Sequence, residues 1–184
     1  MVSTIIFIRG SRRYFKFIRT LESECTPSKI MQRIDVLSIR PNSEIPIHMP
    51  PLGLRYLAAD LIKNRISVEI KDCLIDNLSI EETVSFIKEN GIKIVCISCC
   101  SDELPWVRNL VRSIKAVLDV KVIVGGLHPS GVLEKIYSDI KGIDFSVYSE
   151  GEVAISLLVR AILENNLKAE RLNKIPNLIY KHEG

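Results

Sequence analysis

From residue 50 onward, short apolar segments alternate with longer segments of helical periodicity, and this alternation constrains the fold more than any other feature. Five candidate strands share a β-rich, apolar character, at residues 4–8, 68–71, 94–98, 121–124 and 145–148. Three of them have cores that are continuously apolar, which is typical of strands covered on both faces. The pattern therefore predicts an α/β protein with a doubly wound, five-stranded parallel sheet and helices on both faces.

Composition limits the chain to ordinary globular classes. It has 184 residues, 47% of them hydrophobic and 26% charged, so we expect a single domain over 1–184. The 25 Lys and Arg residues are interleaved with 22 Asp and Glu residues, and a net charge of +3 disfavours nucleic acid as a partner.

No apolar run approaches the ~20 residues that cross a bilayer, and five scattered cysteines suit a reducing compartment. We therefore expect a cytoplasmic protein without a membrane segment.

Two stretches depart from the alternation. Residues 10–49 are longer than a simple crossover needs and are expected to form an insertion or a lid. Within them, aromatic and cationic residues at 12–21 favour an amphipathic helix packed on the domain, with an anion-binding or RNA-contacting arm as the alternative. Residues 34–37 suggest a short extra strand or an extended stretch, and residues 166–184 are expected to form a C-terminal linker.

Small residues follow the predicted first, third and fourth strands. In doubly wound sheets ligands bind beyond the carboxyl ends of the strands, where the strand order reverses. The residues at these ends are small: Gly10, Ser98 and the Gly125-Gly126 pair. Their small size would let a flat or anionic group approach the backbone. The alternative for the glycine pair is an ordinary turn. The sequence contains neither a P-loop nor a Gly-x-Gly-x-x-Gly motif after the first predicted strand.

Four short motifs together resemble a known family. They are PPLGLRYLAA at 50–59, VEIKD at 68–72, VGGLHP at 124–129, and IDF with EGE at 143–145 and 150–152. Their order and spacing resemble the N-terminal cobalamin (B12)-binding domain of B12-dependent radical S-adenosylmethionine proteins, whose fold is Rossmann-like and flavodoxin-like. IPNLIY at 175–180 is similar to the family's link into its catalytic barrel.

The resemblance implies that the corrin ring of cobalamin lies over the carboxyl edge of the sheet. Its nucleotide tail would enter the crevice among strands one, three and four. Gly125 and Gly126 would border the tail, and Ser98 would hydrogen-bond near its benzimidazole end. The cofactor-binding residues implied or favoured by position are Gly10, Gly53, Leu54, Ser98, Cys99, Gly125, Gly126, His128, Glu150 and Gly151.

Two departures from the family bear on metals. The Asp-x-His-x-x-Gly motif, whose histidine ligates cobalt from below in methionine synthase-type domains, is absent, so cobalamin is expected to bind without that ligand. His48 could replace it, although a solvated loop histidine is the favoured interpretation. Cys96 and Cys100 begin a Cys-x-x-x-Cys-x-x-Cys cluster motif, but Glu103 holds its third position. The [4Fe-4S] cluster and S-adenosylmethionine would therefore belong to a downstream radical domain, in cis or in trans.

The leading hypothesis is a cobalamin-binding module that presents the corrin to a methyltransferase or cyclase domain outside this chain, with no catalytic residue of its own. The first alternative is a degenerate cobalamin fold without cofactor, used for docking or for positioning a substrate. The second is a free-standing flavodoxin-like enzyme that uses Cys99 or Cys100 as nucleophile.

Overall fold

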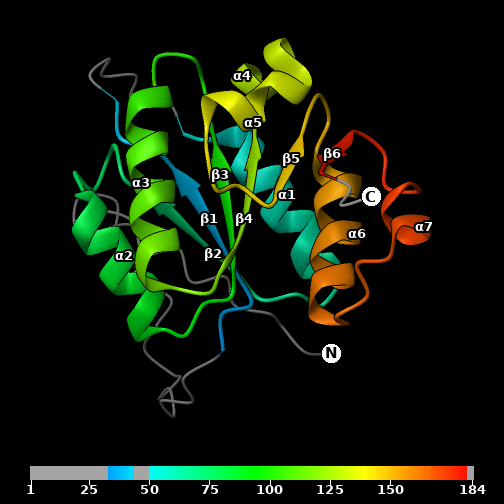
Figure 1. Ribbon diagram of the computed structural model, residues 1–184. Helices are drawn as coiled ribbons and strands as arrows, with labels where there is room; N and C mark the ends of the chain where they lie inside the picture. Colours follow the sequence, from blue (N-terminus) through cyan, green and yellow to red (C-terminus); the bar gives the residue numbers. More distant parts are fainter. Residues whose placement is uncertain (1–32, 44–49, 182–184) are drawn as a thin grey trace, which may run out of the picture.

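The computed structural model of the protein describes residues 33–43 and 50–181, and it contains one sheet with helices on both faces (Figure 1). The strands are β1 (Val36–Arg40), β2 (Val68–Asp72), β3 (Ile94–Ser98), β4 (Lys121–Gly125), β5 (Phe145–Val147) and β6 (Leu178–Tyr180). The helices are α1 (Leu52–Lys63), α2 (Ile80–Glu89), α3 (Leu104–Val117), α4 (Leu127–Val132), the 3-10 turn η2 (Leu133–Lys135), α5 (Ile136–Asp139), α6 (Glu152–Leu163) and α7 (Ala169–Leu172).

The predicted fold class is confirmed by the sheet topology. The strand order is β2-β1-β3-β4-β5-β6, and the first five strands pair in parallel. This 2-1-3-4-5 order is the flavodoxin-like form of the doubly wound sheet, and its order reverses between β1 and β3. The topology therefore places a ligand site at the carboxyl ends of these two strands.

The structure adds a sixth strand to the five that were expected. β6 pairs antiparallel with β5, and both β6 and α7 come from the stretch predicted to be a linker. The hydroxyl of Tyr137 anchors this return strand by donating to the carbonyl oxygen of Ile179 at 3.0 Å. Residues 169–180 therefore belong to the folded sheet domain.

The place expected for the first strand is held by β1. Residues 4–8 lie outside the described residues, whereas β1 comes from the stretch where only a short extra strand was suggested, and it pairs with both β2 and β3. The turn that reaches the carboxyl edge after this strand is therefore the one at 41–43. Gly10 and His48 also lie outside the described residues.

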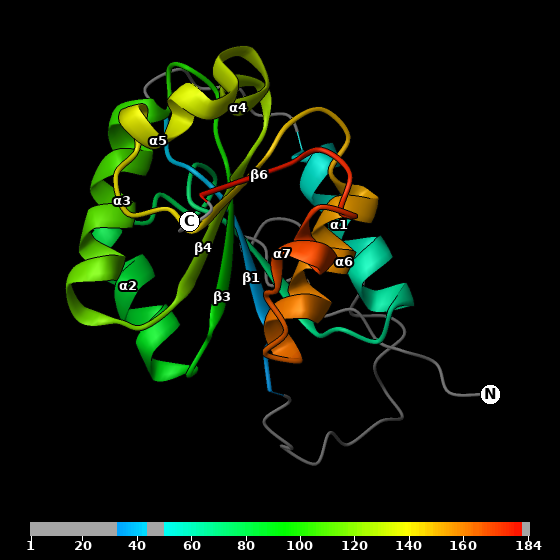
Figure 2. The same ribbon diagram turned by 45° about the vertical axis from the view of Figure 1, so that its right-hand side comes forward.

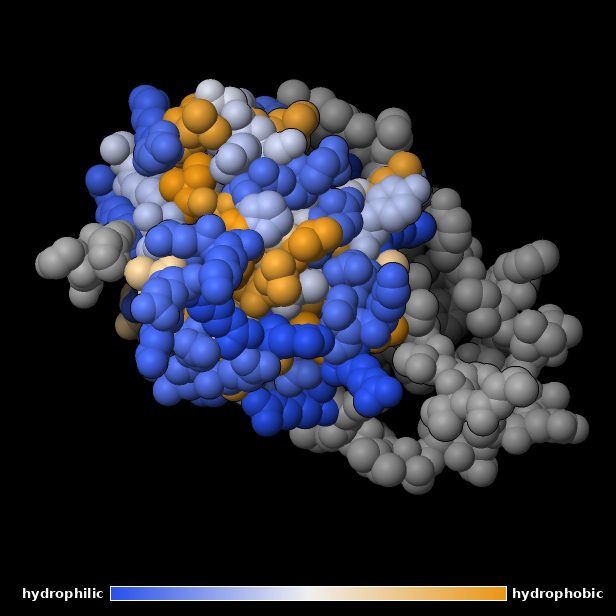
Figure 3. All heavy atoms as spheres, turned by 90° about the vertical axis from the view of Figure 1, so that its right-hand side faces the viewer, coloured by the Kyte–Doolittle hydropathy of each residue, from blue (hydrophilic) through white to orange (hydrophobic). Residues whose placement is uncertain are grey.

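Alternate strand residues build two cores, one on each face of the sheet. Val95 and Ile97 of β3 pack on the face covered by α2 and α3, whereas Ile94 and Cys96 pack on the face covered by α1 and α6 (Figures 1 and 2). The continuously apolar strands predicted from the sequence are thus buried on both faces. On its outer side, the α6 and α7 face is mostly hydrophilic, with apolar side chains in separate groups (Figure 3).

Helix ends follow the local signals in two cases and depart from them in a third. The sequence Ser79-Ile80-Glu81-Glu82 predicts a capping box at the start of α2, and the structure forms it: the Ser79 amide donates to Glu82 at 2.8 Å and the Glu82 amide donates to the Ser79 hydroxyl at 3.1 Å. Pro105 lies in the first turn of α3. The apolar spacing over residues 129–138 predicts a single helix. The structure instead divides this stretch among α4, η2 and α5, and Leu133 has a φ of +49° at the break.

Candidate functional site

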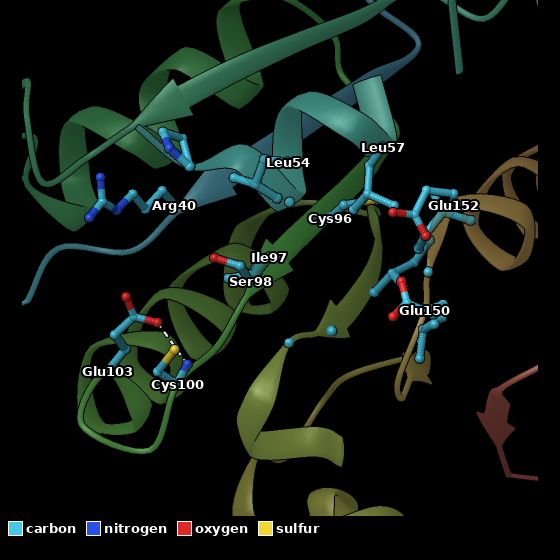
Figure 4. Close-up of a pocket in the computed structure, with 18 of the residues that line it drawn as sticks. Arg40, Leu54, Leu57, Cys96, Ile97, Ser98, Cys100, Glu103, Glu150 and Glu152 are labelled. Carbon is cyan, nitrogen blue, oxygen red and sulfur yellow. Dashed lines mark hydrogen bonds between the residues drawn. The ribbon is translucent and has the colours of Figure 1, made fainter. Parts of the chain in front are cut away.

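A groove of about 420 Å³ opens at the carboxyl ends of β1, β3, β4 and β5. Figure 4 shows it between the first turns of α1 and the tips of the strands, with Arg40 and Glu103 at one end and Glu150 and Glu152 at the other. The volume is within the range of about 300–1,000 Å³ that is usual for small-molecule sites. The groove lies where the strand order reverses, as the topology requires.

An apolar floor runs under the middle of the groove. Cys96, Ile123 and Val147 lie on one face of three neighbouring strands and line it from below. Leu54 and Leu57 of α1 line it from the side. A floor of this kind accepts a flat apolar group and excludes water from it.

Sheet register brings Ser98 and Gly125 together at this floor. The two residues are partners in the β3 and β4 pairing, and both line the groove. The Ser98 hydroxyl has no hydrogen-bond partner among the described residues. A β-carbon at Gly125 would stand 3.5 Å from the carbonyl oxygen of Val147, an ordinary contact distance. The groove here is therefore open because Gly125 lacks a side chain, and the nearest free polar group is a hydroxyl.

Gly126 has a structural role that differs from that of Gly125. Its φ is +108°, and a β-carbon there would lie 2.9 Å from the carbonyl oxygen and 3.0 Å from the amide nitrogen of Cys99. Real β-carbons do not approach backbone atoms so closely. The same carbonyl of Cys99 accepts a hydrogen bond from the His128 amide at 2.9 Å, so this glycine lets the β4 turn pack on the β3 turn.

Two predicted site residues do not line the groove. Cys99 lies in the core, where its thiol donates to the carbonyl of Cys100 at 3.3 Å. His128 is 8% exposed; its Nδ1 is 3.0 Å from the Ser101 hydroxyl and its Nε2 is 3.3 Å from a carboxylate oxygen of Asp139. The start of α4 turns His128 toward α5, and for this reason it stabilises the turn instead of facing the groove.

The polar end of the groove holds side chains that the sequence analysis missed. Arg40 and Asp72 are register partners on β1 and β2, and their side chains form an ion pair at 3.2 Å. Burial raises the pKa of the Glu103 carboxyl, which accepts a hydrogen bond of 2.7 Å from the Cys100 amide. Strand register decides these contacts, and only an assignment of β1 to residues 36–40 could have indicated Arg40.

The remaining predicted residues of α1 and the β5 turn do line the groove. Gly53, Leu54, Glu150 and Gly151 all contribute to its walls. A β-carbon at Gly53 would meet nothing within 4 Å, whereas one at Gly151 would lie 3.3 Å from the Leu57 side chain. Four carboxylates and one arginine line the groove, so its rim accepts hydrogen bonds more readily than it donates them.

Cys96 and Cys99 are packing residues of the core. Desolvation by burial raises the pKa of Cys96 and of Cys99 to about 12. At neutral pH these two thiols therefore stay protonated. Within 33–43 and 50–181, no group of three His, Cys, Asp or Glu side chains is placed to hold a metal ion. These thiols therefore have none of the activation that a nucleophile requires.

We expect the buried thiols to resist modification. In a Cys25→Ser/Cys100→Ser background, which leaves Cys73, Cys96 and Cys99, native protein should react with Ellman's reagent about 100-fold more slowly than protein unfolded in guanidinium chloride. The increase in absorbance of the released aromatic thiolate, followed over time in both states, measures these rates. Equal rates in the two states would contradict the burial of Cys73, Cys96 and Cys99.

The strand order and the groove define a doubly wound α/β module that binds a ligand at its switch point. The chain belongs to the B12-binding domain family, whose family model, described as B12 binding domain, matches residues 42–159. The family resemblance read from the sequence motifs is confirmed at this level.

Similar proteins are known from sequence and from structure. The chain is 29% identical over 161 residues to an uncharacterized methyltransferase of Pyrococcus horikoshii, and the match covers 84% of this chain and 34% of that protein. The radical S-adenosylmethionine methyltransferase TsrM from Kitasatospora setae has a similar fold, with a TM-score of 0.71 and 23% identity over 83% of this chain and 29% of that one. OxsB, a cobalamin-dependent S-adenosylmethionine radical enzyme, matches with a TM-score of 0.69 and 18% identity over 82% of this chain and 21% of that one. The chain thus spans about a third or less of each of these proteins.

In the described part of the chain, no helix is both long and apolar enough to cross a membrane.

Proposed function

We propose that this chain binds cobalamin in the groove and presents it to a radical S-adenosylmethionine domain outside the chain. The observation that carries the proposal is the open apolar floor at Gly125 with the unpartnered hydroxyl of Ser98 beside it, in a chain of the B12-binding family. The methyltransferase names of the similar proteins support methyl transfer as the reaction class. Bound cobalamin would supply the cobalt centre for that chemistry.

The residues present fit the chemistry of cobalamin. Its benzimidazole tail is flat and largely apolar, and the floor formed by Cys96, Ile123 and Val147 offers matching surface. Ser98 would donate a hydrogen bond to a nitrogen of the tail. The corrin carries amide side chains whose N–H groups are donors, and Glu150 and Glu152 at the rim are acceptors for them.

The tail phosphate needs a separate partner because most charged groups of the groove are acidic. Helix α1 starts at the groove wall with Leu52, and its N-terminus has no side-chain cap and no acidic residue in its first turn. Its free amides and the positive end of its dipole would favour an anion there. Gly53 leaves this approach open, since a β-carbon on it would meet nothing within 4 Å.

Within this proposal the chain's own residues bind and orient the cofactor, and none is assigned a chemical step. The cobalt would have no ligand from the absent Asp-x-His-x-x-Gly motif. A [4Fe-4S] cluster and S-adenosylmethionine would be held by the partner domain, in cis or in trans. We place the protein in the cytoplasm, because the four cysteines of the described residues are all free thiols.

A spectral titration tests the proposal. Purified protein mixed with hydroxocobalamin should shift the cobalamin absorption bands in a saturable way and should retain cobalamin in a near 1:1 ratio through gel filtration. Bovine serum albumin at the same concentration serves as the control for nonspecific retention. A spectrum equal to that of free hydroxocobalamin, with none retained, would reject cofactor binding and favour the docking module that lacks it.

A further inference from the structure

A second hollow, of about 530 Å³, lies between α3 and the loop that joins α5 to β5. Arg108, Arg112 and Lys115 follow each other at positions i, i+4 and i+7, so they share one face of α3 and line the hollow from that side. Lys141 and Gly142 line it from the loop. Figures 1 and 2 both show this loop beside α3, on the face of the sheet away from α1 and α6.

The loop is held close to α3 by a glycine. Gly142 has a φ of +91°, and a β-carbon there would stand 3.4 Å from the Lys115 side chain and 3.6 Å from that of Val111. Tyr137 and Ile140, at the two ends of α5, are buried in the core beneath the loop. The two walls of the hollow are therefore held by packing, and cationic side chains line both of them.

The hollow carries an excess of positive charge. Asp139 is the one carboxylate among its lining residues, against four cations. A hydrogen bond from Lys135 is the main cause that lowers the pKa of Asp139, which therefore stays ionised, and Arg108 contacts the same carboxylate at 3.9 Å. Lys115 forms an ion pair with Asp144, and Lys121 forms a second ion pair with the same carboxylate.

Arg112 and Lys141 have no carboxylate partner. Both are exposed, and neither makes an ion pair or hydrogen bond with another described residue. Like charges four residues apart on a helix destabilise it. Asp139 contacts only Arg108 of this pair, so an anion beside Arg112 would further reduce the repulsion. The chain as a whole carries a net charge of only +3, and this one hollow has an excess of the same size.

We propose that the hollow is a binding site for a small phosphorylated ligand, distinct from the cobalamin groove. A phosphate monoester carries about −1.5 to −2 charges near pH 7, which matches this excess better than a single carboxylate does. Guanidinium groups bind phosphate oxygens through paired N–H donors, and Arg112 offers such a fork beside the ammonium of Lys141. The Ser138 side chain at the rim adds a neutral donor. The volume accommodates a ligand up to about the size of a mononucleotide.

Calorimetric titration with AMP and with inorganic phosphate tests the site, using sodium chloride of equal ionic strength as the baseline. Saturable heat is expected with AMP, together with amide shifts at Gly142 and Arg112 in ¹⁵N spectra. The Arg112→Gln/Lys141→Gln variant should bind at least about tenfold more weakly, since two charge-assisted contacts are lost. The Lys63→Gln/Lys88→Gln variant removes the same number of positive charges from other surfaces and should bind as the parent does.

Three results would overturn the proposal. The first is an equal response to chloride and to phosphate compounds, and the second is unchanged AMP binding in the Arg112→Gln/Lys141→Gln variant. The third is binding to vesicles that contain phosphatidic acid without any binding of AMP or phosphate, which would identify a lipid surface as the source of the phosphate. Hydroxocobalamin titration of the same variants should be unaffected, because none of the four substituted residues lines the groove.

Discussion

Replacing Gly126 with alanine is expected to lower the free energy of unfolding by about 2–4 kcal/mol. Two effects add at this position. A φ of +108° is strained for any residue with a β-carbon, and the new methyl group would lie 2.9 Å from the carbonyl oxygen of Cys99. That oxygen belongs to backbone and cannot rotate away. It also accepts the His128 amide, so a shift of the β3 turn would weaken the start of α4 as well.

Urea unfolding followed by circular dichroism measures this effect, and Gly125→Ala is the matched control. A β-carbon at Gly125 would have only an ordinary contact, at 3.5 Å, so the control should change the free energy of unfolding by less than about 1 kcal/mol. A free energy of unfolding for Gly126→Ala equal to that of the control would contradict the close packing of the β3 turn against the β4 turn.

The two glycines show what the sequence could and could not predict about the site. Gly125 and Gly126 marked the right edge of the sheet, because adjacent glycines after a buried strand indicate a turn there, although the pair alone is weak evidence for a ligand. Both glycines line the groove, but the signal carried no information on which of them also lets the β4 turn pack on the β3 turn. That distinction depends on the neighbouring strands, through Cys99 for Gly126 and Val147 for Gly125.

Strand register accounts for the site residues that were missed. The segment Val36–Arg40 contains Ser38 and Arg40, so its apolar signal is weaker than that of residues 4–8, although its pairing with β2 and β3 makes it a central strand. Arg40 reaches the groove only because β1 ends there beside Asp72. Pairing of this kind joins residues 32 positions apart, and no local pattern encodes it.

Other elements were predictable to the extent that their signals were local. The capping box at Ser79 and the buried strands β3 and β4 formed as expected, because side-chain spacing alone specifies them. The strand β6 has three half-buried residues and no clear periodicity, and its place depends on the distant hydroxyl of Tyr137. His128 was expected either to help start its helix or to line the groove edge, and it lies in the first turn of α4; its contact with Asp139 of α5 could not be foreseen.

Replacing Gly125 with leucine is expected to weaken cobalamin binding by about 10- to 100-fold, or about 1.4–2.7 kcal/mol, while the fold is retained. A side chain at this position lies on the same strand face as Ile123, which forms the groove floor, so it would occupy space within the 420 Å³ cavity. The tail of the cofactor would then have to displace leucine atoms or remain outside. Because Ser98 is the register partner of Gly125, its hydroxyl would be covered at the same time.

Gly131→Leu provides the matched control for this variant. It adds the same side chain at a glycine of α4 where a β-carbon would meet nothing within 4 Å and which does not line the groove. Both variants would be compared with the parent by hydroxocobalamin titration and by urea unfolding. Loss of affinity in Gly125→Leu alone, at near-parent stability, assigns the tail to this floor. Equal affinity in all three proteins would show that the cofactor does not bind at the tips of β3 and β4, because the leucine side chain at position 125 would occupy that surface.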